Sequence, residues 1–217
     1  MHPHAARKRE TSMVNIKVVA FDCDGVLFDT EQANRNYYSS ILKHFGRPAV
    51  TDEQFAFVHM HTVFESLAYL FPDEKNLEAA HVFRKGMDYR EYLEHLTVEP
   101  HLASLLEKIR PHFKTAIATN RTDTMNRLLA EYNLDRQFDL VVTASDVERP
   151  KPNPDVLLKI LDYFDIPPHQ AIYIGDSRLD ELAARAAAIP LVAYRNPALS
   201  ADCHVNSLKE IEALLEI

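Results

Sequence analysis

The stretch FDCDGVLFDT, residues 21–30, places two aspartates one residue apart at the end of an apolar run, and a glycine follows them. The run VNIKVVAF (14–21) is rich in β-branched residues, which is typical of a buried strand. Because residues at i and i+2 near a strand end project to the same side, Asp22 and Asp24 can act on one ligand. Alone, the pair is also compatible with an acidic turn, since aspartate and glycine are common turn residues.

Four further apolar runs predict buried strands, and helical segments separate the later ones. The alternation of strands and helices predicts an α/β fold, with a parallel sheet covered by helices on both faces. The predicted strands are KTAIAT (114–119), FDLVVTA (138–144), AIYIGD (171–176) and PLVAY (190–194). The predicted helices are 101–113, 122–134, 154–164, 178–189 and 208–217.

Two of these helices carry recognisable start signals. For the helix at 154–164 we expect Asn153 as the N-cap and Pro154 at the first helical position, where a missing N–H costs nothing. For the helix at 122–134 we expect Thr122 or Asp123 as the N-cap.

The interval between the first two predicted strands is too long for one crossover helix. Residues 31–98 contain several helical segments and no clear strand. We therefore predict an α-helical cap at 31–98, inserted into a core formed by 14–30 and 99–217. Residues 1–13 are polar and basic, and we expect them to be an extension outside the core.

Charge and cysteine content exclude several classes of protein. The net charge of −8 and a pI near 5.7 argue against nucleic acid or an anionic membrane as partners. No apolar stretch approaches the roughly 20 residues that a membrane span needs. The two cysteines do not form a disulfide framework, so we expect a cytoplasmic protein. The oligomeric state stays open.

Polar side chains follow the predicted strands at the points where the strands end. Thr119 and Asn120 follow the second strand, Lys151 lies in the loop after the third, and Asp176 follows the fourth, with Asp180 just beyond. Ligands bind beyond the carboxyl ends of strands in open α/β sheets. We therefore expect these side chains to meet the two aspartates of the first stretch.

The residue types suit phosphoryl transfer. Clustered carboxylates are the oxygen ligands that Mg²⁺ prefers, and a carboxylate such as Asp22 can attack phosphorus to form an aspartyl-phosphate. Asp24 can then reach the leaving oxygen as a general acid. Lys151 and the Thr119 hydroxyl can neutralise and orient the equatorial oxygens of the phosphoryl group.

Each residue also has a purely structural explanation. Asn120 could be a turn residue, Lys151 a solvated loop lysine, and Asp176 a helix N-cap. Asp180 could favour a helix dipole. Four such motifs at four consecutive strand ends are hard to obtain by chance, so the functional interpretation is favoured. Cys23, between the two aspartates, is expected to be a buried thiol rather than a nucleophile.

At this point the sequence resembles a known family. FDCDGVLFDT, ATNR, KPNPD and GDSRLDELAA resemble, in order and spacing, the four motifs of the haloacid dehalogenase-like superfamily. The resemblance is closest to its phosphoglycolate phosphatase and β-phosphoglucomutase branch, which has a helical cap after the first motif. It implies a Rossmann-like core with the cap closing over the site.

The resemblance implies a role for each motif residue. Asp22 would be the nucleophile and a Mg²⁺ ligand. Asp24 would be the general acid and base, with its backbone carbonyl on the metal, and Asp176 would be the third protein ligand.

The same resemblance places the remaining motif residues around the transferring group. Thr119 and Asn120 would bind the phosphoryl group, and Lys151 would pair with it. Asp180 would support Asp176 or Lys151.

At three positions we compare this chain with the usual residues of the family. Dehalogenases of the superfamily lack the second aspartate, so Asp24 favours phosphoryl chemistry. The sugar-phosphate mutases carry a catalytic histidine at the position of Asn34, which disfavours a mutase. Relatives usually have glycine where this chain has Ala188 at the end of a helix.

The cap is expected to select the substrate. Candidate substrate contacts are Arg121, Asn34, His59 and His61. The His-x-His pair could instead bind a metal, although two histidines without a nearby carboxylate are more often ordinary polar positions.

Together these features predict a Mg²⁺-dependent phosphatase that hydrolyses a small phosphorylated metabolite, phosphoglycolate-like or a sugar phosphate, through an aspartyl-phosphate. A phosphomutase of the β-phosphoglucomutase type is the alternative among enzymes. A non-catalytic module that binds a phosphorylated ligand or a protein is the alternative from another class.

Overall fold

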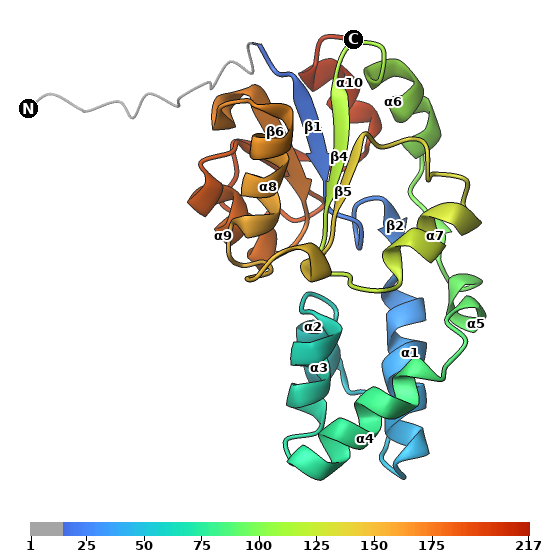
Figure 1. The fold of residues 1–217 in the computed structure, drawn as a ribbon. Coiled ribbons are helices and arrows are strands. Elements are labelled where there is room, and N and C mark those ends of the chain that lie inside the picture. The colour runs from blue at the N-terminus through green and yellow to red at the C-terminus, as the bar shows by residue number, and fades with distance from the viewer. Residues whose placement is uncertain (1–14) are drawn as a thin grey trace, which may run out of the picture.

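The chain forms a six-stranded parallel sheet with the strand order β5-β4-β1-β6-β7-β8. A computed structural model describes residues 15–217, so the predicted extension at 1–13 lies outside the described residues. The expected α/β fold with a parallel sheet is confirmed (Figure 1). The strands are β1 (Val18–Phe21), β4 (Lys114–Ala118), β5 (Leu140–Val142), β6 (Ala171–Gly175), β7 (Leu191–Tyr194) and β8 (Cys203–Val205).

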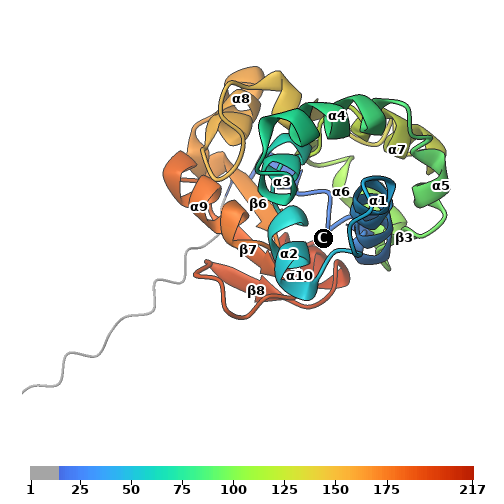
Figure 2. The same cartoon turned by 90° about the horizontal axis from the view of Figure 1, so that it is seen from below.

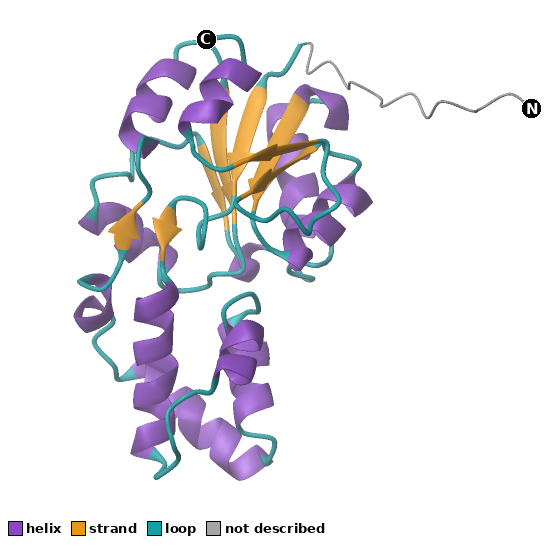
Figure 3. Ribbon diagram, turned by 180° about the vertical axis from the view of Figure 1, so that it is seen from behind, coloured by secondary structure: helices purple, strands orange, loops and turns teal. Residues whose placement is uncertain are grey.

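Helices cover both faces of the sheet (Figures 1 and 3). Alternate residues of β1 serve the two faces, because successive side chains of a strand point in opposite directions. Val18 and Ala20 belong to one buried cluster and Val19 and Phe21 to the other. The first face carries α8 (Asp155–Phe164) and α9 (Arg178–Ala187), and the second carries α6 (Leu102–Ile109), α7 (Met125–Glu131) and α10 (Lys209–Leu214).

A group of helices lies beyond the carboxyl edge of the sheet (Figures 1 and 2). Their apolar faces pack on one another through aromatic pairs such as Tyr37 with Tyr92, whose ring centroids are 5.5 Å apart. We call this group the cap. Its helices are α1 (Glu31–His44), α2 (Asp52–Val58), α3 (Val63–Leu70), α4 (Glu74–Lys85) and α5 (Arg90–Leu93).

A two-stranded antiparallel ribbon lies where the chain enters and leaves the cap. It pairs β2 (Phe28–Asp29) with β3 (Thr97–Val98). The expectation of no strand in residues 31–98 is therefore wrong at the end of that range. Two-residue strands give no apolar period, so the sequence carries no signal for them.

Glu99 fastens the returning chain to the sheet. Its side chain is buried and accepts hydrogen bonds from the Tyr194 hydroxyl at 2.7 Å and from Arg195 Nη1 at 2.6 Å. Its backbone N–H donates to the carbonyl of Leu27, beside the ribbon. These contacts fix the position from which the cap projects over the sheet edge.

Three details differ from the sequence-based expectations. The strand β8 was not expected, because an edge strand with exposed positions lacks a continuous apolar run. Asn153 is not an N-cap: its backbone N–H and side chain both bond to Pro150 in a turn, and α8 begins after Pro154. Neither Thr122 nor Asp123 caps α7, which follows Thr124 without a side-chain cap.

Two short 3₁₀ turns, η1 (Ala144–Asp146) and η2 (Pro168–Gln170), complete the described elements. Within residues 15–217, no helix combines the length and the apolar character that crossing a membrane requires.

Replacing Ala188 with glycine should stabilise the protein. Ala188 ends α9 in the left-handed region with φ of 56°, where an alanine side chain crowds the following carbonyl. We expect Ala188→Gly to raise the free energy of unfolding by about 0.5–1 kcal/mol in urea denaturation. Ala187→Gly, one residue earlier in helical conformation, is the matched control and should lower it by about 0.5–1 kcal/mol. A lower free energy of unfolding in Ala188→Gly would contradict the claim that the backbone of Ala188 is strained.

Candidate active site

The carboxyl ends of three adjacent central strands bring the predicted residues together. Because β4, β1 and β6 are neighbours in the sheet, the residues that follow them meet at one edge. The backbone N–H of Asp22 bonds to the Ile174 carbonyl at 2.8 Å, and that of Thr119 bonds to the Val142 carbonyl at 3.0 Å. The backbone hydrogen bonds of the sheet thus continue to Asp22 and to Thr119, and they fix the backbone direction at these two residues.

Two glycines give the carboxylates room. Gly25 has φ of +78°, and a Cβ placed there would lie 2.2 Å from Asp176 Oδ2. A Cβ at Gly175 would lie 2.5 Å from the Cβ of Asp180. Both glycines are therefore required by the close approach of an acidic side chain.

The Lys151 ammonium is the centre of the site. Its side chain is 2% exposed, and its three donors bond to the Ala118 carbonyl at 3.2 Å, the Tyr173 hydroxyl at 3.0 Å and Asp180 Oδ1 at 2.7 Å. Asp22 Oδ1 forms an ion pair with the same nitrogen at 2.8 Å. Lys151 therefore holds both Asp22 and Asp180 by charge.

Asp180 holds both the ammonium and the start of α9. Its Oδ2 accepts hydrogen bonds from the Ser177 backbone N–H at 2.9 Å and hydroxyl at 2.6 Å, in a capping box. Its Oδ1 accepts from Lys151 and from the Tyr173 hydroxyl. Since Ser177 is the N-cap, the structural explanation of Asp176 as a helix cap does not apply.

Asn120 fixes the loop that carries Lys151. Its side-chain oxygen accepts from the Lys151 backbone N–H at 3.0 Å, and its amide nitrogen donates to the Lys151 carbonyl at 3.0 Å. The same nitrogen donates to the Met60 carbonyl at 3.1 Å, which belongs to the cap. The Thr119 hydroxyl accepts from the backbone N–H of Arg121 at 3.1 Å.

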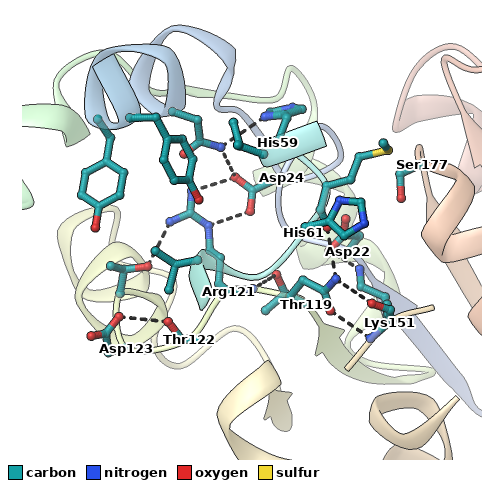
Figure 4. A pocket seen from close by; sticks show the side chains of 18 of the residues that line it. Asp22, Asp24, His59, His61, Thr119, Arg121, Thr122, Asp123, Lys151 and Ser177 are labelled. Carbon is teal, nitrogen blue, oxygen red and sulfur yellow. Dashed lines mark hydrogen bonds and ion pairs between the residues drawn. The ribbon is translucent and has the colours of Figure 1, made fainter. Parts of the chain in front are cut away.

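Asp24 forms a two-point ion pair with Arg121 (Figure 4). Arg121 Nε donates to Asp24 Oδ2 at 2.8 Å and Nη2 donates to Oδ1 at 2.7 Å. Burial opposes ionisation of Asp24, but the Arg121 guanidinium outweighs it and holds the pKa of Asp24 at about 2. In this arrangement Asp24 is a carboxylate at neutral pH.

Two other acidic groups of the site, Asp22 and Asp176, have pKa values shifted in the opposite direction. Burial raises the pKa of Asp22 to about 7, although Lys151 opposes the rise. Burial, together with the charges of Asp180 and Asp22, raises the pKa of Asp176 well above its usual range. Carboxylates this close in a buried site repel one another, so a cation would relieve them.

The donor set fits a hard divalent cation. Asp22, Asp176 and Asp180 can each offer an oxygen, and the three oxygens lie within 4.8 Å of one another. Asp180 already accepts hydrogen bonds at both oxygens, which leaves Asp22 and Asp176 as the free carboxylates. One or two carboxylates with waters and a phosphate are the usual environment of Mg²⁺.

The cap contributes Asn34, His59 and His61 to the same cavity (Figure 4). Asn34 Nδ2 lies 3.4 Å from Asp24 Oδ1 and 3.2 Å from His59 Nδ1. Burial lowers the pKa of His59. His61 stacks on Phe57 with ring centroids 3.8 Å apart. Neither histidine belongs to the acidic cluster found among the described residues.

Several residues of the cavity were not predicted to be site residues from the sequence. Tyr37, Arg84, Tyr89 and Asp123 line it. Tyr89 accepts a hydrogen bond from Arg121 Nη1 at 2.6 Å. Arg84 lies in a long charged segment where many residues look alike, so no sequence signal distinguishes it from a solvated arginine.

Comparison with known proteins agrees with this geometry. The family model described as haloacid dehalogenase-like hydrolase matches residues 19–194. The chain belongs to this family. A phosphoglycolate phosphatase of Chromobacterium violaceum is 30% identical over 220 residues, covering 94% of this chain and 99% of that protein.

Two solved structures share the fold of the chain. A HAD-superfamily hydrolase of subfamily IA from Geobacter sulfurreducens shares 38% identity and a TM-score of 0.76, covering 93% of this chain and 97% of that chain. A β-phosphoglucomutase of Clostridium difficile shares the fold, with a TM-score of 0.82 at 19% identity, covering 93% of this chain and 96% of that one. The expected family and an enzyme of the phosphatase type are confirmed.

Mg²⁺ should stabilise the protein through the free carboxylates. Because the pKa of Asp22 is raised in the folded protein, the protonated form of Asp22 stabilises the fold. This stabilisation is fully present below the pKa that Asp22 has in the unfolded chain, and it is lost as the pH rises through about 7. At pH 8 we expect Asp22→Asn to raise the melting temperature of the metal-free protein by roughly 2–6 °C. Mg²⁺ should raise the melting temperature of the wild type, and it should raise the melting temperature of Asp22→Asn much less.

The exposed Asp135→Asn is the matched control and should keep the wild-type response to Mg²⁺. An equal Mg²⁺-induced shift in wild type and Asp22→Asn, measured by calorimetry, would exclude Asp22 as a ligand.

Proposed function

We propose that this hydrolase is a Mg²⁺-dependent phosphatase of a small phosphorylated metabolite. One observation carries the proposal: the carboxylates of Asp22 and Asp176 meet the Thr119 hydroxyl and the Lys151 ammonium in one cavity at the edge of the sheet. Such a set can hold a divalent cation and a phosphoryl group together. The phosphatase named among the relatives supports this reaction class.

In the first step Asp22 attacks the phosphorus of the bound ester. A phosphorus–oxygen bond forms to the carboxylate, and the bond to the leaving oxygen breaks with its electron pair. Lys151 and the Thr119 hydroxyl stabilise the charge on the phosphoryl oxygens. Asn120 acts through Lys151 by holding its backbone.

Asp24 protonates the leaving oxygen and then takes a proton from the water that hydrolyses the aspartyl-phosphate. The second role suits the carboxylate that Arg121 stabilises. The first role requires a proton, so Asp24 must leave its ion pair with Arg121 and carry a proton before the ester bond breaks. The proton that Asp24 takes from water in the second step restores this state for the next turnover. Arg121 is thereby a positioning residue for Asp24.

Asp22, Asp176 and the Asp24 carbonyl would hold the Mg²⁺. The bound ion supplies charge neutralisation to the phosphoryl oxygens and to the crowded carboxylates. Asp180 keeps Lys151 in place and is not available as a ligand, since both its oxygens accept hydrogen bonds.

Removing the Asp22 carboxylate should abolish turnover. We expect Asp22→Asn to lower kcat by about 10³-fold or more on a panel of phosphate esters with Mg²⁺, because the amide cannot attack phosphorus. Cys23→Ala, which changes the neighbouring buried thiol, is the control and should retain most of the activity.

Three results would count against the proposal. Asp22→Asn with wild-type activity would exclude it as the nucleophile. A wild type that is inactive on the whole panel would favour a non-catalytic module. With a bisphosphate primer, an isomerised sugar phosphate with little free phosphate would identify a mutase instead.

A further inference from the structure

The loop that follows β7 contacts a residue of the site from outside the cavity. We call residues 195–200 the β7 loop. Strands β6 and β7 are parallel neighbours, with Gly175 opposite Ala193, so the residues that follow both strands lie at the same edge of the sheet. Asp176 follows β6 directly, and Asn196 of the β7 loop donates a hydrogen bond from Nδ2 to the Asp176 backbone carbonyl at 2.7 Å. The proposed reaction gives Asn196 no role, and Asn196 lies outside the residues that line the cavity.

A turn fixes the orientation of the Asn196 amide. Its Oδ1 accepts a hydrogen bond from the backbone N–H of Ala198 at 3.1 Å. Asparagines that bond to the backbone two residues further on form tight turns, and the Asn196-Pro197 pair favours a turn as well. Because Oδ1 is the acceptor of this bond, Nδ2 is the atom that faces Asp176, and a carbonyl accepts only from a donor.

The β7 loop is fastened on both sides of this turn. Arg195 donates from its backbone N–H to the Val205 carbonyl at 2.8 Å and from Nη1 to Glu99 Oε1 at 2.6 Å. At the other end, the backbone N–H of Ser200 donates to Glu181 Oε2 at 3.2 Å. Glu181 is buried in the first turn of α9. The loop is therefore tied to β8, to the segment that returns from the cap, and to α9.

The peptide group between Asp176 and Ser177 is held from two sides. Its carbonyl accepts from Asn196, and its N–H donates to Asp180 Oδ2 at 2.9 Å. A peptide group is planar, so fixing its two polar atoms fixes the whole plane and the backbone of Asp176 with it. The direction in which the Asp176 carboxylate leaves the backbone depends on this plane. Asn196 is the contribution of the β7 loop to that direction.

We propose that Asn196 is a positioning residue for Asp176 and sets the affinity of the site for Mg²⁺. The inference rests on the proposed function in one respect, namely that Asp176 is a ligand of the ion. Partners that orient a metal ligand strengthen metal binding, and their loss typically weakens it by about 10- to 100-fold. The β7 loop orients the Asn196 amide in advance, so the ion does not have to order it on binding.

A role in the turn alone is the other explanation of Asn196. Loss of the turn would lower the melting temperature with and without Mg²⁺ alike, because the turn does not involve the carboxylate that binds the ion. Positioning predicts a change in the Mg²⁺ concentration at which the stabilisation is half complete. This half-effect concentration depends neither on catalysis nor on the amount of folded protein, so it separates the two roles.

The test follows the melting temperature of the full chain, without substrate, as Mg²⁺ is added. An ion that binds the folded protein raises this temperature according to its affinity. Asn196→Ser keeps a hydroxyl that can form the turn but is too short to donate to the Asp176 carbonyl. We expect it to raise the half-effect concentration about 10-fold. At saturating Mg²⁺ its kcat on a phosphate ester should equal that of the wild type, because Asn196 touches neither ion nor ester.

Asn153→Ser is the matched control. Asn153 is also a half-buried loop asparagine, and its Nδ2 donates to the Pro150 carbonyl at 3.1 Å. It lies outside the residues that line the cavity, and its hydrogen bond does not reach the peptide group after Asp176. This variant should keep the half-effect concentration of the wild type. Asp176→Asn removes the proposed ligand and should lose most of the response to Mg²⁺.

The outcomes separate this inference from the proposed function. If Asp176→Asn responds to Mg²⁺ as the wild type does, or if neither responds, the proposed Mg²⁺ site fails and the role of Asn196 fails with it. If only Asp176→Asn loses the response and Asn196→Ser keeps the wild-type half-effect concentration, the role of Asn196 alone is overturned. An equal rise in Asn196→Ser and Asn153→Ser would overturn it too. Hydrolysis of phosphate esters by the wild type with Mg²⁺ tests the proposed function independently of these variants.

Discussion

The burial of one ammonium group among carboxylates is the constraint on which the site depends. Removing a charge from water costs several kcal/mol unless charges and hydrogen bonds compensate it. Lys151 is compensated by Asp22, Asp180 and the Tyr173 hydroxyl, which lie just after β1, in α9 and in β6. The parallel sheet must place those strand ends side by side, and Gly175 must leave room for Asp180, for this network to exist.

The network divides the acidic residues by task. Asp180 has both oxygens occupied and so serves the structure of the site, whereas Asp22 and Asp176 keep oxygen atoms for ligands. Asp24 is separated from them by its pairing with Arg121, which stabilises its charge. Different environments thus give different pKa values to carboxylates within one cavity, as acid and base roles require.

The cap supplies the side chains that can select among substrates. The core residues that surround the proposed phosphoryl position are the same kind for any ester, so they do not select among substrates. Arg84, Asn34 and His59 come from the cap and line the other side of the cavity. The contact from Asn120 to the Met60 carbonyl joins the two halves directly. Substrate selection therefore depends on how the cap sits over the sheet edge.

Much of the core could be predicted from the sequence because strand ends in a parallel sheet share an edge. Asp22, Thr119, Lys151 and Asp176 each follow a strong apolar run, and the structure brings them together. The edge strand β8 was missed because its residues are partly exposed and lack such a run.

The cap was less predictable for a different reason. Its cavity is lined by residues from separate helices, and nothing in the linear pattern relates Arg84 to Tyr89 or to Asp123. Burial of the Arg84 side chain follows from tertiary packing, which a charged helical segment does not reveal. The ion pair of Asp24 with Arg121 likewise joins residues far apart in the chain.

The most direct test of the account is to trap the covalent enzyme. The wild type is mixed with a hydrolysable phosphate ester and Mg²⁺, quenched in acid within the first turnover, and mapped by peptide mass spectrometry. The account predicts one phosphoryl group on the peptide that contains residues 21–30, located on Asp22. Turnover of the ester with a phosphoryl group on any other residue, Cys23 included, would contradict it.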